Sequence, residues 1–159
     1  MDIETAIKLN RIKVIPKSQK VDDLIKKELE AAEQTITKAQ NEEDTSWKID
    51  KAFYAAFYAA RAYMYRERLI ENEDHGAVII FLEDKVKNGE LSIDALSYYK
   101  SLSSARKADR YQHSFTEERA RISVEQAEKL VSEVKKILAQ ENGKHRHGEV
   151  ILSFIPFLI

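Results

Sequence analysis

Four side chains that could bind phosphate and move protons share one short segment, residues 104–115. Asp109, Arg110 and His113 follow Arg106 by three, four and seven residues, so a helix would place all four on one face. Guanidinium groups bind phosphate through forked donors, and an imidazole exchanges protons near neutral pH. The spacing therefore predicts a site for phosphate chemistry at this position.

The same residues also fit an ordinary solvated helix face. Arg106 and Asp109, and likewise Asp109 and His113, stand at common ion-pair spacings, each worth about 0.3–0.5 kcal/mol. Residues 100–121 hold six Lys or Arg and three acidic residues, whereas residues 18–44 hold four Lys and eight acidic residues. A local basic face can meet a phosphate backbone or an acidic helix of this or another molecule, and both interpretations stay open.

The chemical interpretation is cleavage of a phosphodiester without metal, in which a ribose 2′-hydroxyl attacks its own phosphate. Arg106 and Arg110 would bind the phosphate and stabilise its developing charge, and His113 would act as general base or acid. One imidazole does not easily serve as both base and acid. A two-fold dimer whose clusters face each other would supply the second imidazole.

Composition gives little support to metal or cofactor chemistry. The chain has no cysteine, and the histidines at 75, 145 and 147 are scattered, so we expect no metal site. It has no glycine-rich phosphate loop, dinucleotide fingerprint or nucleophile elbow, so we expect no cofactor. The net charge of −1 gives no global argument for binding nucleic acid or a membrane surface.

The residues that must position segment 104–115 show apolar side chains at helical spacing, which predicts helices. With 4 Gly and 2 Pro, the chain favours long helices, and no strand-like alternation competes before the last ten residues. Ser92 can cap a helix that carries the segment, and Ser123 with Gln126 forms a capping box for the last helix. The predicted helices span residues 3–12, 18–40, 47–70 and 75–87, then one from Ser92 and one from Ser123 to Gly143.

The helix predicted over residues 47–70 carries aromatic side chains on two faces, which is typical of a central helix. Such rings can stack on nucleic-acid bases, but their helical spacing favours packing in the core or in a dimer. The residues concerned are Phe53, Tyr54, Phe57, Tyr58, Tyr63 and Tyr65.

The fold class predicted is all-α, a compact bundle of about five helices, with residues 1–142 as a single domain. Residues 143–159 form a tail that is either disordered or not native to the domain, and its apolar end, 150–159, could instead pack on the bundle or on a partner. No signal peptide or membrane-spanning run is visible. We therefore expect a cytoplasmic protein without membrane contact.

Three segments together resemble a known family, the HEPN domains (higher eukaryotes and prokaryotes nucleotide-binding). They are Lys51-Ala-Phe-Tyr-Ala-Ala-Phe-Tyr-Ala-Ala-Arg-Ala62, Glu73-Asp-His-Gly76 and the arginine-containing residues 104–113, and the resemblance covers about residues 8–140. It is strongest to small stand-alone prokaryotic members. It implies a helical bundle that forms a homodimer, with a polar motif near the dimer cleft.

Active members of that family are metal-independent ribonucleases, often toxins of toxin–antitoxin or defence systems. Their motif is an arginine, four to six residues, then a histidine, which Arg106 and His113 satisfy with six residues between. Lys107 stands where asparagine is usual after the arginine. Phe115 stands where toxins paired with a minimal nucleotidyltransferase have tyrosine, and Tyr111 stands where related non-nuclease members replace the histidine.

The resemblance thus predicts Arg106 and His113 as catalytic residues, with Lys107, Asp109, Arg110 and Tyr111 binding the substrate or nucleotide. Three functions follow. The first is a dimeric ribonuclease, and the second is a non-catalytic module that binds a nucleotide or a nucleotidyltransferase partner. The third is a structural dimer without a ligand. The expected partners are accordingly a second copy of the chain, RNA or a nucleotide, and such a nucleotidyltransferase.

Overall fold

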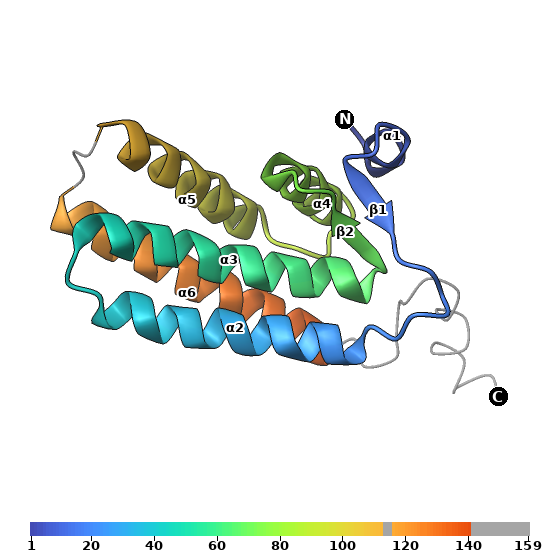
Figure 1. The fold of residues 1–159 in the computed structure, drawn as a ribbon, viewed down its shortest axis with the longest axis horizontal. Helices are drawn as coiled ribbons and strands as arrows, with labels where there is room; N and C mark the ends of the chain where they lie inside the picture. Colours follow the sequence, from blue (N-terminus) through green and yellow to red (C-terminus); the bar gives the residue numbers. More distant parts are fainter. Residues whose placement is uncertain (113–115, 141–159) are drawn as a thin grey trace.

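The computed structural model describes residues 1–112 and 116–140, and of residues 109–112 it describes only the backbone. The described part contains six helices and two short strands (Figure 1). In chain order these are α1 (Ile3–Lys8), β1 (Ile12–Val14), α2 (Asp22–Asn41), α3 (Thr45–Arg66), β2 (Leu69–Glu71), α4 (His75–Lys87), α5 (Ile93–Gln112) and α6 (Glu117–Gln140). The predicted all-α bundle is confirmed.

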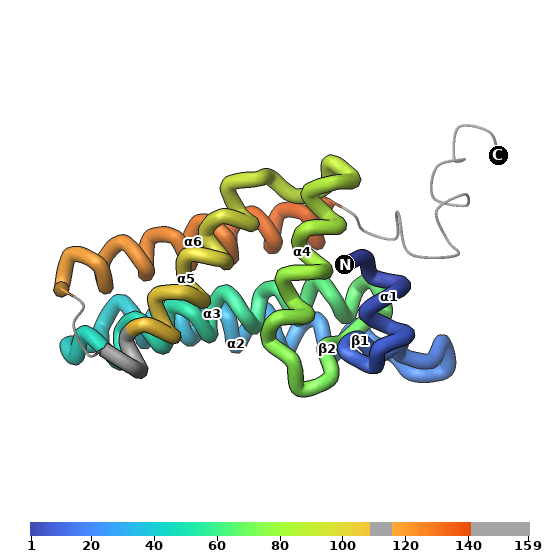
Figure 2. Tube along the Cα trace, turned by 90° about the horizontal axis from the view of Figure 1, so that it is seen from above, coloured from blue at the N-terminus to red at the C-terminus, as the bar shows by residue number. Residues whose placement is uncertain are grey.

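The four long helices lie alongside one another, and α1, α4 and the strands gather toward one end (Figure 1). Seen from above, α4 runs across α3 while α5 follows it obliquely (Figure 2). The helix α3 contacts α2, α4, α5 and α6. It is therefore the central helix of the bundle, against which these helices pack.

Small residues explain why so many helices can approach α3. Ala52, Ala55, Ala56, Ala59 and Ala60 are all fully buried, and a methyl group lets a neighbouring backbone come close. Larger aromatic rings fill the spaces between these contacts. The expectation that most of the aromatic residues of this helix pack in the core is confirmed, with Phe53, Phe57, Tyr63 and Tyr65 buried and Tyr54 and Tyr58 half-buried.

Two predicted helices were too long, because their ends form a small antiparallel sheet. In this sheet Ile12 pairs with Glu71 and Val14 with Leu69. The first helix ends at Lys8, and α3 ends at Arg66, after which Arg68 has a positive φ of 60°. The expectation that no strand precedes the last ten residues was wrong, since three-residue strands carry too little alternation to be read.

The helices that flank the candidate segment begin differently. Ser92 does cap α5, because its Oγ accepts a hydrogen bond from the backbone N–H of Ala95 at 3.1 Å. The start predicted for the last helix at Ser123 was wrong, as α6 begins at Glu117 and buries Ser123 completely. The residue that caps α6 is Thr116, whose Oγ1 accepts from the N–H of Arg119 at 3.2 Å.

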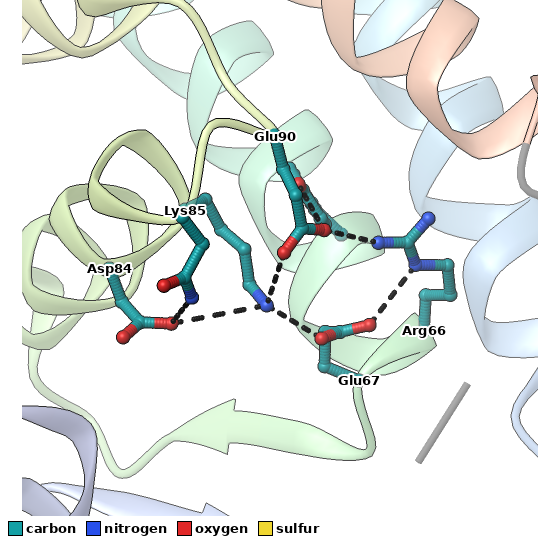
Figure 3. Close-up of polar contacts among 7 residues, drawn as sticks. Arg66, Glu67, Asp84, Lys85 and Glu90 are labelled. Carbon is teal, nitrogen blue, oxygen red and sulfur yellow. Dashed lines mark hydrogen bonds and ion pairs between the residues drawn. The ribbon is translucent and has the colours of Figure 1, made fainter. Parts of the chain in front are cut away.

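A buried ion-pair network fastens the end of α3 to α4 (Figure 3). Lys85 of α4 places Nζ 2.6 Å from Oε1 of Glu67, which directly follows α3, and 3.6 Å from Oε2 of Glu90. Arg66 contacts the same two carboxylates at 3.3 and 3.4 Å. Because each buried charge meets an opposite charge, the network is tolerated in the core and fixes how α4 is placed.

Within the described residues, no helix combines the length and apolar character that a membrane span requires. The predicted tail at 143–159, including Gly143 and the apolar end, lies outside the described residues.

Candidate functional site

Arg106 lies near the C-terminal end of α5, and its side chain is almost entirely buried against α3. Its Nε donates to Oδ1 of Asp50 at 3.0 Å, and its Nη2 donates to the hydroxyl of Tyr54 at 2.8 Å. Charge-assisted hydrogen bonds of this kind are short and strongly directional. The guanidinium group is therefore held in one orientation by two residues of a different helix.

Aromatic rings complete this environment. The Arg106 Cζ atom lies 4.8 Å from the ring centroid of Tyr54 and 4.9 Å from that of Phe53, so both rings make cation–π contacts. Among the residues that the structure describes, none accepts a hydrogen bond from Nη1. The guanidinium carries more N–H donors than these two hydrogen bonds use, and Nη1 takes part in neither.

The α3 side of the site follows from helical spacing. Asp50 and Tyr54 are four residues apart, so they lie one above the other on the same face. The sequence reasoning assigned Tyr54 to packing and did not single out Asp50. The available signal was an isolated carboxylate at helical spacing from a run of aromatic residues.

The other predicted site residues are either exposed or have side chains that the structure does not describe. Lys107 is exposed on α5. Asp109, Arg110 and Tyr111 belong to the backbone of α5, but their side chains are not described, and His113 lies outside the described residues. The structure therefore bears directly on Arg106 and Lys107 alone.

The partner that the structure shows for Arg106 lies on another helix. The i, i+3 spacing with Asp109 favoured a surface pair within one helix, whereas the observed partner is Asp50 of α3. Burial explains the difference, because a guanidinium that leaves water needs a fixed carboxylate close by. The interpretation of Arg106 as part of a solvated face was wrong.

A histidine that the sequence reasoning left aside lies next to this centre. His75 is the first residue of α4, where Asp74 caps the helix by accepting from the N–H groups of Gly76 and Ala77 at 2.9 and 3.3 Å. The His75 ring centroid is 4.6 Å from that of Phe57 and 6.4 Å from that of Tyr54. The signal that could have identified His75 was its place beside a helix start, opposite the aromatic helix.

Farther along α3, Arg61 is shared by two carboxylates. Its Nη1 is 3.7 Å from Oε1 of Glu28 on α2, and its Nε is 3.5 Å from Oε1 of Glu71 on β2. Burial raises the pKa of both glutamates above the ordinary value, although the charge of Arg61 opposes that change. This cluster carries an excess of negative charge, so it is unsuited to binding phosphate.

The core beside Arg106 also holds a buried phenol. Tyr99 of α5 packs its ring centroid 5.8 Å from that of Phe53, and its hydroxyl lacks a hydrogen-bond partner within the described part of the chain. Burial, followed by the charge of Glu71, raises the pKa of Tyr99 well above the ordinary value. Tyr99 therefore stays neutral and serves as packing behind the site.

Metal binding finds no support among residues 1–112 and 116–140, which contain no group of three or more histidine, aspartate or glutamate side chains placed to hold an ion. The guanidinium of Arg106 can donate hydrogen bonds to an anion and stabilise negative charge.

Fold and site together define a class of protein, an all-α bundle whose central aromatic helix fixes a buried arginine from a neighbouring helix. Residues 21–140 match the HEPN domain family. Because this match covers well over half of the chain, the chain belongs to the HEPN domain family. Comparisons with curated proteins and with solved structures give no match.

Proposed function

We propose that this protein is a metal-independent endoribonuclease of the toxin or defence type, working as a two-fold dimer. Arg106 binds the scissile phosphate, and His113 transfers a proton. The observation that carries the proposal is the fixed guanidinium of Arg106, which is held in place by the two hydrogen bonds that it donates to side chains of α3. A donor positioned before the reaction stabilises developing charge without reorganisation.

Cleavage of single-stranded RNA in EDTA tests this proposal. The wild-type protein is expected to produce fragments with a 2′,3′-cyclic phosphate and a 5′-hydroxyl, and His113→Ala is expected to lose at least about 10²-fold in rate. Equal rates in the two proteins would remove His113 from the mechanism. No cleavage by either protein would remove the ribonuclease activity itself.

The dimer is tested separately by light scattering over a range of protein concentrations. A two-fold assembly predicts twice the chain mass of 18.4 kDa at concentrations where the protein cleaves RNA. A strict monomer that still cleaves would show that one chain holds a complete site.

A non-catalytic function is favoured by one observation. Asp50 neutralises the charge of Arg106, which weakens attraction for a phosphate and suits an arginine that holds helices together. The protein would then bind a nucleotide or a minimal nucleotidyltransferase, as the position of Tyr111 in the motif also suggests. Co-purification with a nucleotidyltransferase encoded next to it, together with absence of RNA cleavage, would support this function.

A further inference from the structure

His75 and Arg106 come from different helices but lie against the same pair of aromatic rings. The ring centroid of Phe53 is 6.0 Å from that of His75 and 4.9 Å from the Cζ atom of Arg106. For Tyr54 the corresponding distances are 6.4 and 4.8 Å. The imidazole of α4 and the guanidinium of α5 therefore both lie against the same two rings of α3.

His75 and Arg106 differ in their exposure to solvent. Arg106 is buried, whereas His75 is exposed at the first position of α4, with its ring against Phe57 at 4.6 Å. The ring contact limits where the imidazole can point, and the residue is exposed to solvent. An imidazole placed in this way can exchange a proton with a group bound at Arg106.

We propose that His75 is an acid–base group of the Arg106 site, an inference that rests on the RNA cleavage proposed above. The reaction moves two protons. One leaves the 2′-hydroxyl as its oxygen bonds to phosphorus, and one is taken up by the 5′ oxygen as the bond from phosphorus to that oxygen breaks. His75 carries out one of these transfers, as neutral imidazole in the first case and as imidazolium in the second.

This assignment changes what a single chain can do. A site with one imidazole needs the second copy of the chain for its other proton transfer, whereas His75 supplies an imidazole from the same chain. The titratable side chains beside His75 are Tyr54, at 6.4 Å between ring centroids, and the preceding Asp74, which pairs with Arg11 at 2.5 Å. Two further cations lie against rings that His75 also contacts, Arg61 against Phe57 and Arg106 against Phe53.

The test compares the wild-type protein with His75→Phe in EDTA under single-turnover conditions. Phenylalanine keeps the ring contact with Phe57 but cannot carry a proton, so cleavage is expected to fall by at least about 10²-fold. Binding of an RNA with deoxyribose at the cleaved position is expected to remain unchanged, which also shows that the variant is folded. An unchanged cleavage rate would overturn the inference.

Two further readouts separate proton transfer from packing. The rate of His75→Phe is expected to lose one limb of the pH profile that the wild-type protein shows, and His75→Ala is expected to regain cleavage when imidazole is added to the buffer. A profile of unchanged shape at lower height, without rescue by imidazole, would assign His75 to packing and overturn the inference. Absence of cleavage by the wild-type protein would instead overturn the proposed function, and this inference with it.

Discussion

Arg106 is held by residues that lie far from it in the sequence, and this determines what its guanidinium can do. Asp50 balances its charge and Tyr54 fixes its plane, while the rings of Phe53 and Tyr54 limit its movement. A guanidinium fixed in this way loses little freedom when a ligand binds. The cost is a weaker long-range attraction for phosphate, because the pair with Asp50 is neutral overall.

Replacing Asp50 tests how strongly this pair holds the two helices. Asp50→Asn leaves the buried Arg106 without its carboxylate, so the free energy of unfolding is expected to fall by about 1–3 kcal/mol in urea titrations. Glu83→Gln is the matched control, since Glu83 pairs with Lys100 at 3.4 Å on the surface and such pairs are worth about 0–1 kcal/mol. Equal losses in the two variants would contradict the anchoring of Arg106.

The carboxylate of Glu71 gives a prediction with a definite pH dependence. Burial raises its pKa in the folded protein, so the native state binds this proton more tightly than the unfolded chain does. The resulting stability is fully present below the unfolded pKa of about 4.3 and is lost as pH rises through the folded pKa. Glu71→Gln, which resembles the protonated form, is therefore expected to be more stable than the wild type at neutral pH but not near pH 4.

Glu42 is a control in which the pKa change has the opposite direction, and both variants are measured by thermal or urea unfolding as a function of pH. Its hydrogen bond from Lys51 holds its pKa below the ordinary value, so its contribution is present at neutral pH and is lost as pH falls. Glu42→Gln is expected to be less stable than the wild type at neutral pH, with the difference shrinking in acid. A Glu71→Gln protein that behaves in the same way would contradict the effect assigned to burial.

At the scale of elements, α3 and α4 are joined by charges inside the core rather than by apolar packing alone. Lys85 is 5% exposed, and its Nζ lies 5.3 Å from the ring centroid of Phe81 as well as beside Glu67. The helix that carries Lys85 also carries His75, at its opposite end.

Lys85→Met tests this connection by keeping the aliphatic stem and removing the charge. Glu67 then loses a buried partner, so the free energy of unfolding is expected to fall by about 3 kcal/mol. Lys87→Met, on the exposed side of the same helical turn, is the matched control and is expected to change it by less than about 0.5 kcal/mol. A loss in Lys85→Met no larger than the control would show that apolar packing places α4.

The elements differ in how well the sequence predicts them, and the reasons are physical. The helix at His75–Lys87 was predicted at its observed bounds, and in the structure Asp74 caps its start and Asn88 its end. The start of α6 was misplaced because Ser123 and Gln126 imitate a capping box within a longer helix. The strands depend on pairing between Ile12 and Glu71, a contact that local patterns do not contain.

Across the whole molecule, the candidate site also combines features set by local sequence with features set by contacts between distant segments. The helical position of Arg106 follows from local periodicity, but its partners Asp50 and Tyr54 become visible only when α3 and α5 are packed together. His75 joins them from a third helix. Spacing along one helix therefore singled out Arg106, and tertiary packing determined which side chains accompany it.

The central claim is that Arg106 is the phosphate-binding group of a metal-independent RNA-cleaving site. The most direct measurement is the single-turnover rate of RNA cleavage in EDTA for the wild-type protein, Arg106→Lys and Arg121→Lys, with folding of each checked by circular dichroism. Arg106→Lys keeps the charge beside Asp50 but loses the fork, so its rate is expected to fall by about 10²–10³-fold. Arg121→Lys, on the exposed surface of α6, is expected to cleave like the wild type. Cleavage by folded Arg106→Lys at the wild-type rate, or none by the wild type, would contradict the claim.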